Sequence, residues 1–129
     1  MRPTQTPVNL PRLFAALADP TRLRLLNLMA RQEVCVCFFV DILQLSQPKI
    51  SRHLAYLRKA GLVTARREGK WMHYSIQQPT DTNAASILST SLTAVKANPT
   101  MQADLVKLTQ AYCTPQTLIT LKKAPAPTS

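Results

Sequence analysis

The feature that most constrains this 129-residue chain is a change of hydrophobic periodicity at Gly61. Before it, residues 47–60 place their large aliphatic side chains on one narrow helical stripe, and a glycine is a natural C-terminal stop for a helix. After it, residues 62–67 and 70–77 alternate as two strands, with the Glu-Gly pair at 68–69 suited to a tight turn. The segment predicts a helix followed directly by a two-stranded hairpin.

The part of the chain before this segment predicts further helices. Apolar residues recur at helical spacing over residues 10–17, and Asp19 followed by proline is expected to start a second helix over residues 20–31. A β-branched and aromatic stretch covers residues 34–40, and residues 39–45 fit a short third helix. Helices at 20–31, 39–45 and 47–60 followed by a hairpin are typical of a winged helix-turn-helix, whose second paired helix enters the major groove.

Helical periodicity returns after the hairpin. From Asp81 onward a stripe of aliphatic residues predicts one helix, Pro99 breaks it, and a last helix is expected to end near Cys113. The predicted fold class is therefore mainly α (α+β), a winged helix-turn-helix with a two-stranded β-wing and flanking helices.

The charge of the chain indicates a polyanionic partner. Sixteen Lys and Arg against six Asp and Glu give a net charge of +10, and seven of the cations fall within residues 49–70 beside one acid, Glu68. Such an excess favours nucleic acid over membrane as the partner. Cations at this density release counterions from DNA, so we expect the affinity to fall steeply with salt.

Roles can be assigned within the basic segment, with Ser46 as the expected cap of its helix. Side chains near the start of that helix are expected to reach base edges: Gln47, Lys49, Ser51 and Arg52, the last suited to guanine. Four others are expected to bind phosphates: Tyr56, Lys59, Arg67 and Lys70. His53 either contacts phosphate or packs against the core. The competing interpretation is a solvated helix face and a basic hairpin, which for any single lysine is at least as good.

The three cysteines are expected to be ligands or sensors. No apolar run approaches the length of a membrane span, and Met1 to Pro11 holds three prolines and no apolar stretch, so we expect no secretory signal and a cytoplasmic location. Thiols stay reduced in the cytosol, which argues against a disulfide framework.

Three strings resemble the ArsR/SmtB family of winged-helix repressors, which release DNA on binding metal or metalloid. They are Cys35-Val36-Cys37, the stretch from Leu45 to Leu54 (LSQPKISRHL), and the stretch from Leu57 to Val63 (LRKAGLV). The wing from Arg66 to Tyr74 (RREGKWMHY) resembles the arsenic-responsive branch. The resemblance covers residues 10–77 and implies a homodimer with terminal helices packing across the two-fold axis.

With that resemblance the chain divides into four parts. We expect an N-terminal tail at 1–7, a DNA-binding core at 8–78, C-terminal dimerisation helices at 79–113 and a disordered tail at 114–129. The resemblance implies a repressor that binds operator DNA as a homodimer and is released by trivalent arsenic or antimony on cysteine thiolates, and not an enzyme.

The resemblance is incomplete at the thiols. The family's arsenic motif is Cys-Val-Cys-Asp-Leu-Cys, whereas this chain has Phe38 at the acid and Val40 at the third cysteine. Trivalent arsenic and antimony take three sulfurs in a pyramid, so we predict Cys35, Cys37 and Cys113 as the ligands, the last from the same or the partner chain. On an ideal helix Cys35 and Cys37 diverge by about 200°, so an irregular start to the helix is required.

Other interpretations compete with this one. Cys113 alone is more often a buried hydrophobe than a ligand. The dithiol could sense oxidation instead of metalloid, and zinc or cadmium could bind Cys35 and Cys37 with His53 or His73, although the spacing is poor. Residues 81–113 contain no histidine for the family's other site. Plain architectural DNA binding predicts no ligand response, and a thiol reductase lacks both a Cys-x-x-Cys motif and a general base.

Overall fold

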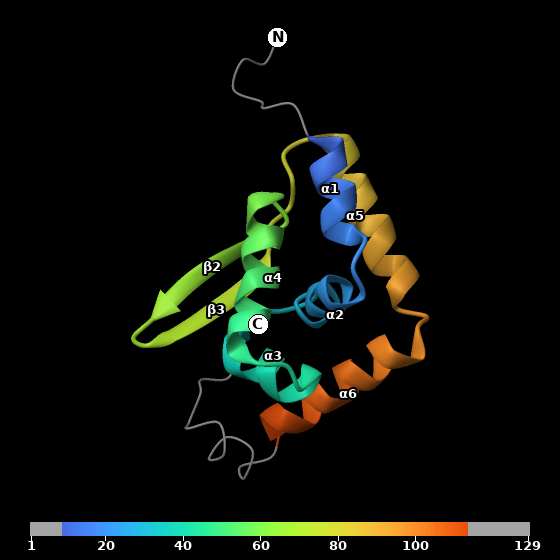
Figure 1. The fold of residues 1–129 in the computed structure, drawn as a ribbon. Helices are drawn as coiled ribbons and strands as arrows, with labels where there is room; N and C mark the ends of the chain where they lie inside the picture. The colour runs from blue at the N-terminus through green and yellow to red at the C-terminus, as the bar shows by residue number, and fades with distance from the viewer. Residues whose placement is uncertain (1–8, 114–129) are drawn as a thin grey trace.

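The computed structural model describes residues 9–113, which form six helices and one three-stranded sheet (Figure 1). The elements are α1 (Leu10–Leu17), α2 (Pro20–Leu28), β1 (Val34–Cys35), α3 (Val36–Leu43), α4 (Gln47–Lys59), β2 (Val63–Glu68), β3 (Trp71–Ile76), α5 (Thr82–Val95) and α6 (Pro99–Cys113). The side chains of residues 112 and 113 are outside the description. The tails expected at 1–7 and 114–129 also lie outside the described residues.

Side-chain caps start five of the described helices, including α6, where Asn98 Oδ1 accepts from the N–H groups of Thr100 and Met101 at 2.9 and 3.2 Å. Asn9, Asp19 and Asp81 each accept a hydrogen bond from the backbone N–H three residues on, at 2.9–3.0 Å, and Ser46 does so at 3.4 Å. These bonds satisfy amides that have no partner inside the helix. The predicted caps Asp19 and Ser46 are confirmed. Gly61, with φ +80°, takes the left-handed conformation just after α4, as its predicted role as a stop requires.

The sheet differs from the expected two-stranded wing. Strands β2 and β3 pair antiparallel from Val63 opposite Ile76 to Glu68 opposite Trp71, and the turn falls at Gly69, with φ +61°, and Lys70. The short strand β1 adds to the other edge of β3, giving the order β1-β3-β2. Cys35 thereby lies opposite His73. The wing is part of a three-stranded sheet that includes the first cysteine.

The third helix begins earlier than predicted. It starts at Val36 instead of residue 39, because only two residues of the 34–40 stretch pair as a strand while the following apolar side chains are buried at helical spacing. It ends at Leu43, because Gln44 takes the left-handed conformation with φ 56°. Helix α2 likewise stops at Leu28 instead of Arg31, and the chain turns there toward β1.

The core lies between α3, α4 and the helices that pack against them, and α6 is joined to it. Phe38 and Phe39 of α3 and the predicted stripe of α4 (Ile50, Leu54, Leu57) are fully buried. Helix α6 is fastened to α2 by a two-pronged ion pair, since Arg24 donates to both oxygens of the buried Asp104 at 2.7 and 2.9 Å. In Figure 1, α4 lies at the front, the β2–β3 hairpin projects to one side, and α1 and α5 lie on the other. No helix within residues 9–113 combines the length and apolarity that a membrane crossing needs.

Candidate functional site

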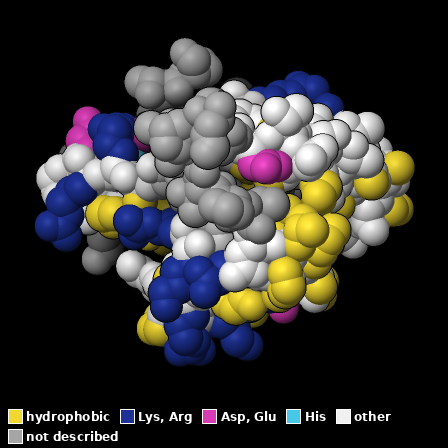
Figure 2. Space-filling model, turned by 90° about the horizontal axis from the view of Figure 1, so that it is seen from above, with side chains coloured by type: hydrophobic (Ala, Val, Ile, Leu, Met, Phe, Trp, Pro, Cys, Tyr) yellow, Lys and Arg dark blue, Asp and Glu magenta, His cyan; other side chains and the backbone are white. Residues whose placement is uncertain are grey.

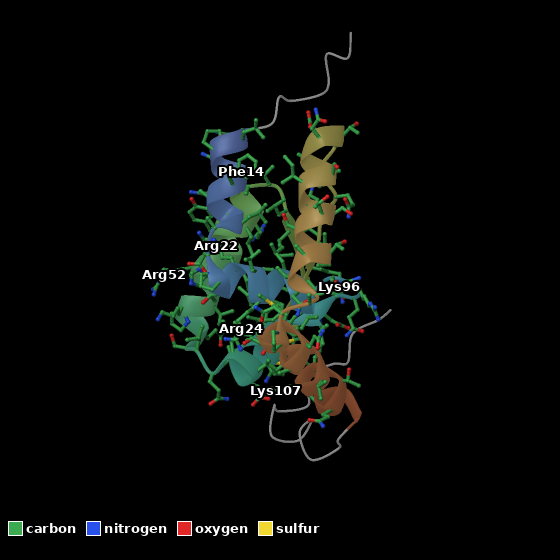
Figure 3. The ribbon with its side chains drawn as sticks, turned by 90° about the vertical axis from the view of Figure 1, so that its right-hand side faces the viewer. Phe14, Arg22, Arg24, Arg52, Lys96 and Lys107 are labelled. Atoms are coloured by element: carbon green, nitrogen blue, oxygen red, sulfur yellow. The ribbon has the colours of Figure 1, made fainter. Side chains whose placement is uncertain are left out.

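The outer face of α4 presents polar side chains to solvent. Gln47, Lys49, Ser51 and Arg52 are all exposed, while the aliphatic stripe on the opposite side is buried. Figure 3 shows Arg52 pointing away from the body of the protein. These four side chains therefore lie where a helix placed in a major groove meets base edges.

Arg22 connects three helices behind that face. Its guanidinium donates to the carbonyls of Ala15 and Ala16 at 2.9 and 3.0 Å, lies 3.2 Å from His53 Nδ1, and stacks 4.2 Å from the centre of the Tyr56 ring. His53 is half-buried against this arginine, whereas the Tyr56 ring is exposed. Sequence reasoning missed Arg22, and the signal for it was a cation in the first turn of a helix capped by an aspartate.

The cations of the wing divide into paired and free ones. Arg66 donates to both oxygens of Glu33 at 2.7 and 2.9 Å, which lowers the pKa of that carboxyl, and lies 3.6 Å from Glu68. Arg67 and Lys70 are exposed, and the Lys70 ammonium lies 5.6 Å from the Trp71 ring centre. Two of the wing's three cations therefore carry the charge that a phosphate would meet.

The two described thiols touch each other at the junction of β1 and α3. Cys35 is buried and has extended backbone angles (φ −72°, ψ 142°), while Cys37 is half-buried in the first turn of α3. Their Sγ atoms are 3.3 Å apart. The divergence expected on a regular helix does not arise, because Cys35 precedes the helix.

This geometry makes the two thiols unequal. The Cys37 thiol donates a hydrogen bond to the Cys35 sulfur, and the backbone N–H groups that start α3 add to it, so the pKa of Cys35 falls to about 7. The same bond and burial raise the pKa of Cys37. Cys35 is thus the thiol that ionises first, and a thiolate is the form that binds soft ions or reacts with oxidants.

Side chains around the thiols bear on what could complete a ligand set. His73 is buried opposite Cys35 on the sheet, with Nε2 3.1 Å from Glu68 Oε1. Among the side chains described between residues 9 and 111, no three His, Cys, Asp or Glu are arranged to hold a metal ion. The zinc alternative with His53 or His73 therefore has no described ligand set. Helix α6, which ends at Cys113, packs against α3, although the Cys113 side chain lies outside the description.

Cys37 also lines a hollow that reaches the first residue of α4. The hollow has a volume of about 380 Å³ and is lined by side chains of α3, of the turn and of the first residue of α4: Cys37, Val40, Asp41, Gln44, Leu45 and Gln47. A ligand on the Cys37 sulfur would therefore lie beside the start of α4.

The comparisons with known proteins agree with the resemblance found in the sequence. Residues 19–65 match the sequence profile described as "Bacterial regulatory protein, arsR family". The chain is 52% identical over 77 residues to the Arsenic resistance transcriptional regulator ArsR1 of Pseudomonas putida, covering 59% of this chain and 58% of that protein. It is 48% identical over 77 residues to the Arsenical resistance operon repressor of Escherichia coli, covering 59% and 66%. The chain therefore spans about three fifths of the length of these relatives.

Three further proteins are matched over more of their own length. An uncharacterized HTH-type transcriptional regulator of Methanocaldococcus jannaschii is 51% identical over 65 residues, which are 50% of this chain and 73% of that one. Among solved structures, HlyU from Vibrio vulnificus is 32% identical with a TM-score of 0.55, covering 66% of this chain and 85% of that one. The repressor BigR from Xylella fastidiosa is 28% identical with a TM-score of 0.57, covering 70% and 86%.

Proposed function

Because the chain belongs to the arsR family of bacterial regulatory proteins, we propose that it is a metalloid-responsive repressor. It binds operator DNA as a homodimer and is released when trivalent arsenic or antimony binds its thiolates. The observation that carries this proposal is that the sulfur atoms of Cys35 and Cys37 lie 3.3 Å apart at the junction of β1 and α3, the helix that precedes α4. Two relatives that match over 77 residues are named for arsenic or arsenical resistance, which supports the same inducer.

The proposed DNA interface is the exposed face of α4 together with the wing. Gln47, Lys49, Ser51 and Arg52 read base edges, and four side chains hold phosphates: Tyr56, Lys59, Arg67 and Lys70. His53 acts behind the surface, where it packs against Arg22. Two copies of α4 would enter successive major grooves about 34–36 Å apart.

A second copy of the chain would cover an apolar surface on α1. Leu10 and Phe14 are 43% and 52% exposed, and Figure 3 shows Phe14 beside α5 on the side away from Arg52. Large apolar side chains grouped in this way favour a protein interface. The pairing would leave both copies of α4 free to face one duplex.

The thiol pair fits a soft ion of pyramidal geometry. Soft thiolates select soft ions, and two sulfurs 3.3 Å apart are close enough to bind one ion. At a metal–sulfur distance of about 2.3 Å they would subtend an angle of about 90°, smaller than the angle of about 109° at tetrahedral zinc. Cys113 is the proposed third ligand, and the packing of α6 on α3 within one chain supports this.

DNA is released if the bound ion changes the position of the wing or of the start of α4. Cys35 belongs to the sheet that carries the wing, and Cys37 faces the hollow that reaches Gln47, so an ion on both sulfurs acts on the wing and on α4 together. A coupling of about 1–3 kcal/mol per site is typical of such linkage. The coupling is reciprocal, so bound DNA must weaken metalloid binding by the same factor.

The test is a DNA-release titration. We would follow fluorescence anisotropy of a duplex enriched by the protein from a random pool, under full reduction, while adding arsenite, antimonite, cadmium or zinc. Arsenite or antimonite should release the wild type, while Cys35→Ser should bind DNA normally and ignore both. Normal release of Cys35→Ser would remove the ligand assignment, and unchanged metalloid affinity of Cys113→Ser would place the third donor elsewhere.

One observation also favours a redox sensor as a second candidate. A thiolate at Cys35 with a thiol 3.3 Å away can react with a two-electron oxidant such as a peroxide. The Cys35 sulfur first becomes a sulfenic acid, and attack by Cys37 then forms the disulfide and expels water. A disulfide between residues this close in sequence is strained, which places this candidate second. Release by peroxide but not by arsenite under reduction would reverse the order.

A further inference from the structure

A second hollow lies on the outer surface between α1 and the C-terminal end of α4. It has a volume of about 260 Å³ and is lined by Arg12 of α1 and by Tyr56 and Lys59 of α4. All three side chains are exposed, and no acid lines this hollow. Two cations and a phenol hydroxyl around one depression offer positive charge and hydrogen-bond donors to a ligand that accepts hydrogen bonds.

The two walls of this hollow are held in fixed relation by Arg22. The guanidinium of Arg22 donates to the carbonyls of Ala15 and Ala16 in the second half of α1, and it stacks on the Tyr56 ring in α4. The side chain of Arg22 is only 14% exposed, so these contacts are largely shielded from water. A shift of α1 against α4 would therefore break the hydrogen bonds of Arg22 to α1 or move its guanidinium off the Tyr56 ring.

The surroundings of the hollow are also basic. A neighbouring depression of about 460 Å³ shares Arg12 and Lys59, and its single acid, Asp81, accepts a hydrogen bond from the amide of Ala84 as the cap of α5. Figure 2, seen from the end where α1 begins and α4 ends, shows Lys and Arg side chains gathered beside a hydrophobic area. An anion that approaches this end of α4 meets no competing free carboxylate among the residues that line the smaller hollow.

We propose that this hollow binds a phosphate of the DNA backbone, so that α1 is part of the DNA-binding surface and Arg12 is a direct contact. The proposal rests on DNA binding by α4, as proposed above. Arg12 and Lys59 supply the charge, and the Tyr56 hydroxyl supplies an oriented donor. Because α1 also carries the apolar surface proposed for the dimer, this phosphate would lie on the inner side of each half-site.

The test is the salt dependence of binding by Arg12→Gln. Each phosphate contact contributes about 0.9 to the slope of log affinity against log salt, so loss of one contact per protomer should lower the slope of the dimer by about 1.8. The loss should be the same on an enriched duplex and on unrelated DNA, because a phosphate carries no sequence information. Arg12→Lys should retain most of the slope.

The matched control is Lys96→Gln, which removes one exposed cation from the other side of the molecule (Figure 3). It should leave the slope unchanged, and sedimentation should give the same oligomeric state for all three variants. An unchanged slope in Arg12→Gln, or an equal fall in Lys96→Gln, would overturn the proposal. A wild type that binds no DNA would instead remove the proposed function itself.

Discussion

Cys35 and Cys37 differ in chemistry although they are two residues apart. One ends a strand and accepts hydrogen bonds from the N–H groups that begin α3, and the other is inside the helix and donates to it. The sequence shows two equivalent thiols, and only the extended backbone at Cys35 makes them unequal. This asymmetry decides which sulfur an electrophilic ion or an oxidant meets first.

A thiolate titration in the Cys113→Ser background tests this asymmetry. Followed by ultraviolet absorbance, one thiol should ionise with a pKa of about 7, because the Cys37 thiol stabilises the Cys35 thiolate. Cys37→Ala removes that donor, so the titration should move upward toward the ordinary thiol value. Cys35→Ala should abolish the low titration altogether. A midpoint that stays near 7 in Cys37→Ala would mean that the backbone N–H groups alone stabilise the thiolate.

At the level of helices and strands, the join between α2 and α6 depends on one ion pair. Asp104 is buried and Arg24 is a quarter exposed, so Asp104→Ala leaves a guanidinium with a reduced hydration shell and no partner. We expect a loss of about 2–3 kcal/mol in the free energy of unfolding, below the range for a fully buried pair.

Urea unfolding would measure this loss. The matched control is Asp41→Ala on α3, whose carboxylate is exposed, and we expect it to change stability by less than about 0.5 kcal/mol. Equal effects of the two substitutions would show that the Arg24–Asp104 pair does not fasten α6.

The elements that could be predicted are those fixed by neighbouring residues. The caps at Asp19 and Ser46, the stop at Gly61 and the antiparallel hairpin depend on residues close together in the sequence, and the structure contains each of them. The expected alternation of buried and exposed residues is not seen in β3, where the neighbours His73 and Tyr74 are both buried. The strand β1 was not predicted, because it exists only through pairing with β3, some forty residues later. For the same reason the predicted start of the third helix was wrong, since it was placed at residue 39 and the helix begins at Val36.

The candidate site divides in the same way. The exposure of Arg52 and its neighbours follows from the helical wheel, and the structure agrees with it. The roles of Arg22 and Arg12 depend on where α1 and α4 meet, which no local pattern contains. The place of Cys113 in a ligand set stays a prediction, since it concerns a side chain outside the description.

For the whole molecule, dimerisation depends on which apolar surface is covered. Phe14→Glu should convert a dimer into a monomer and weaken DNA binding, because one copy alone places a single α4 in the groove. Val106→Glu on α6 is the control, since Val106 is 55% exposed and lies on a different helix. Sedimentation equilibrium would distinguish them, and a monomer from Val106→Glu alone would assign the interface to α6.

The pairing of β1 with β3 determines how an inducer would change the affinity for operator DNA and for unrelated DNA. Cys35 belongs to the same sheet as the hairpin, which is proposed to contact phosphates. Cys37 lies on α3 and lines the hollow that reaches α4, which is proposed to contact bases. An ion bound by both sulfurs would therefore connect these two parts of the DNA-binding surface. Neither part could then adjust alone. An inducer should therefore lower the affinity for operator DNA and the affinity for unrelated DNA together, instead of lowering only the ratio between them.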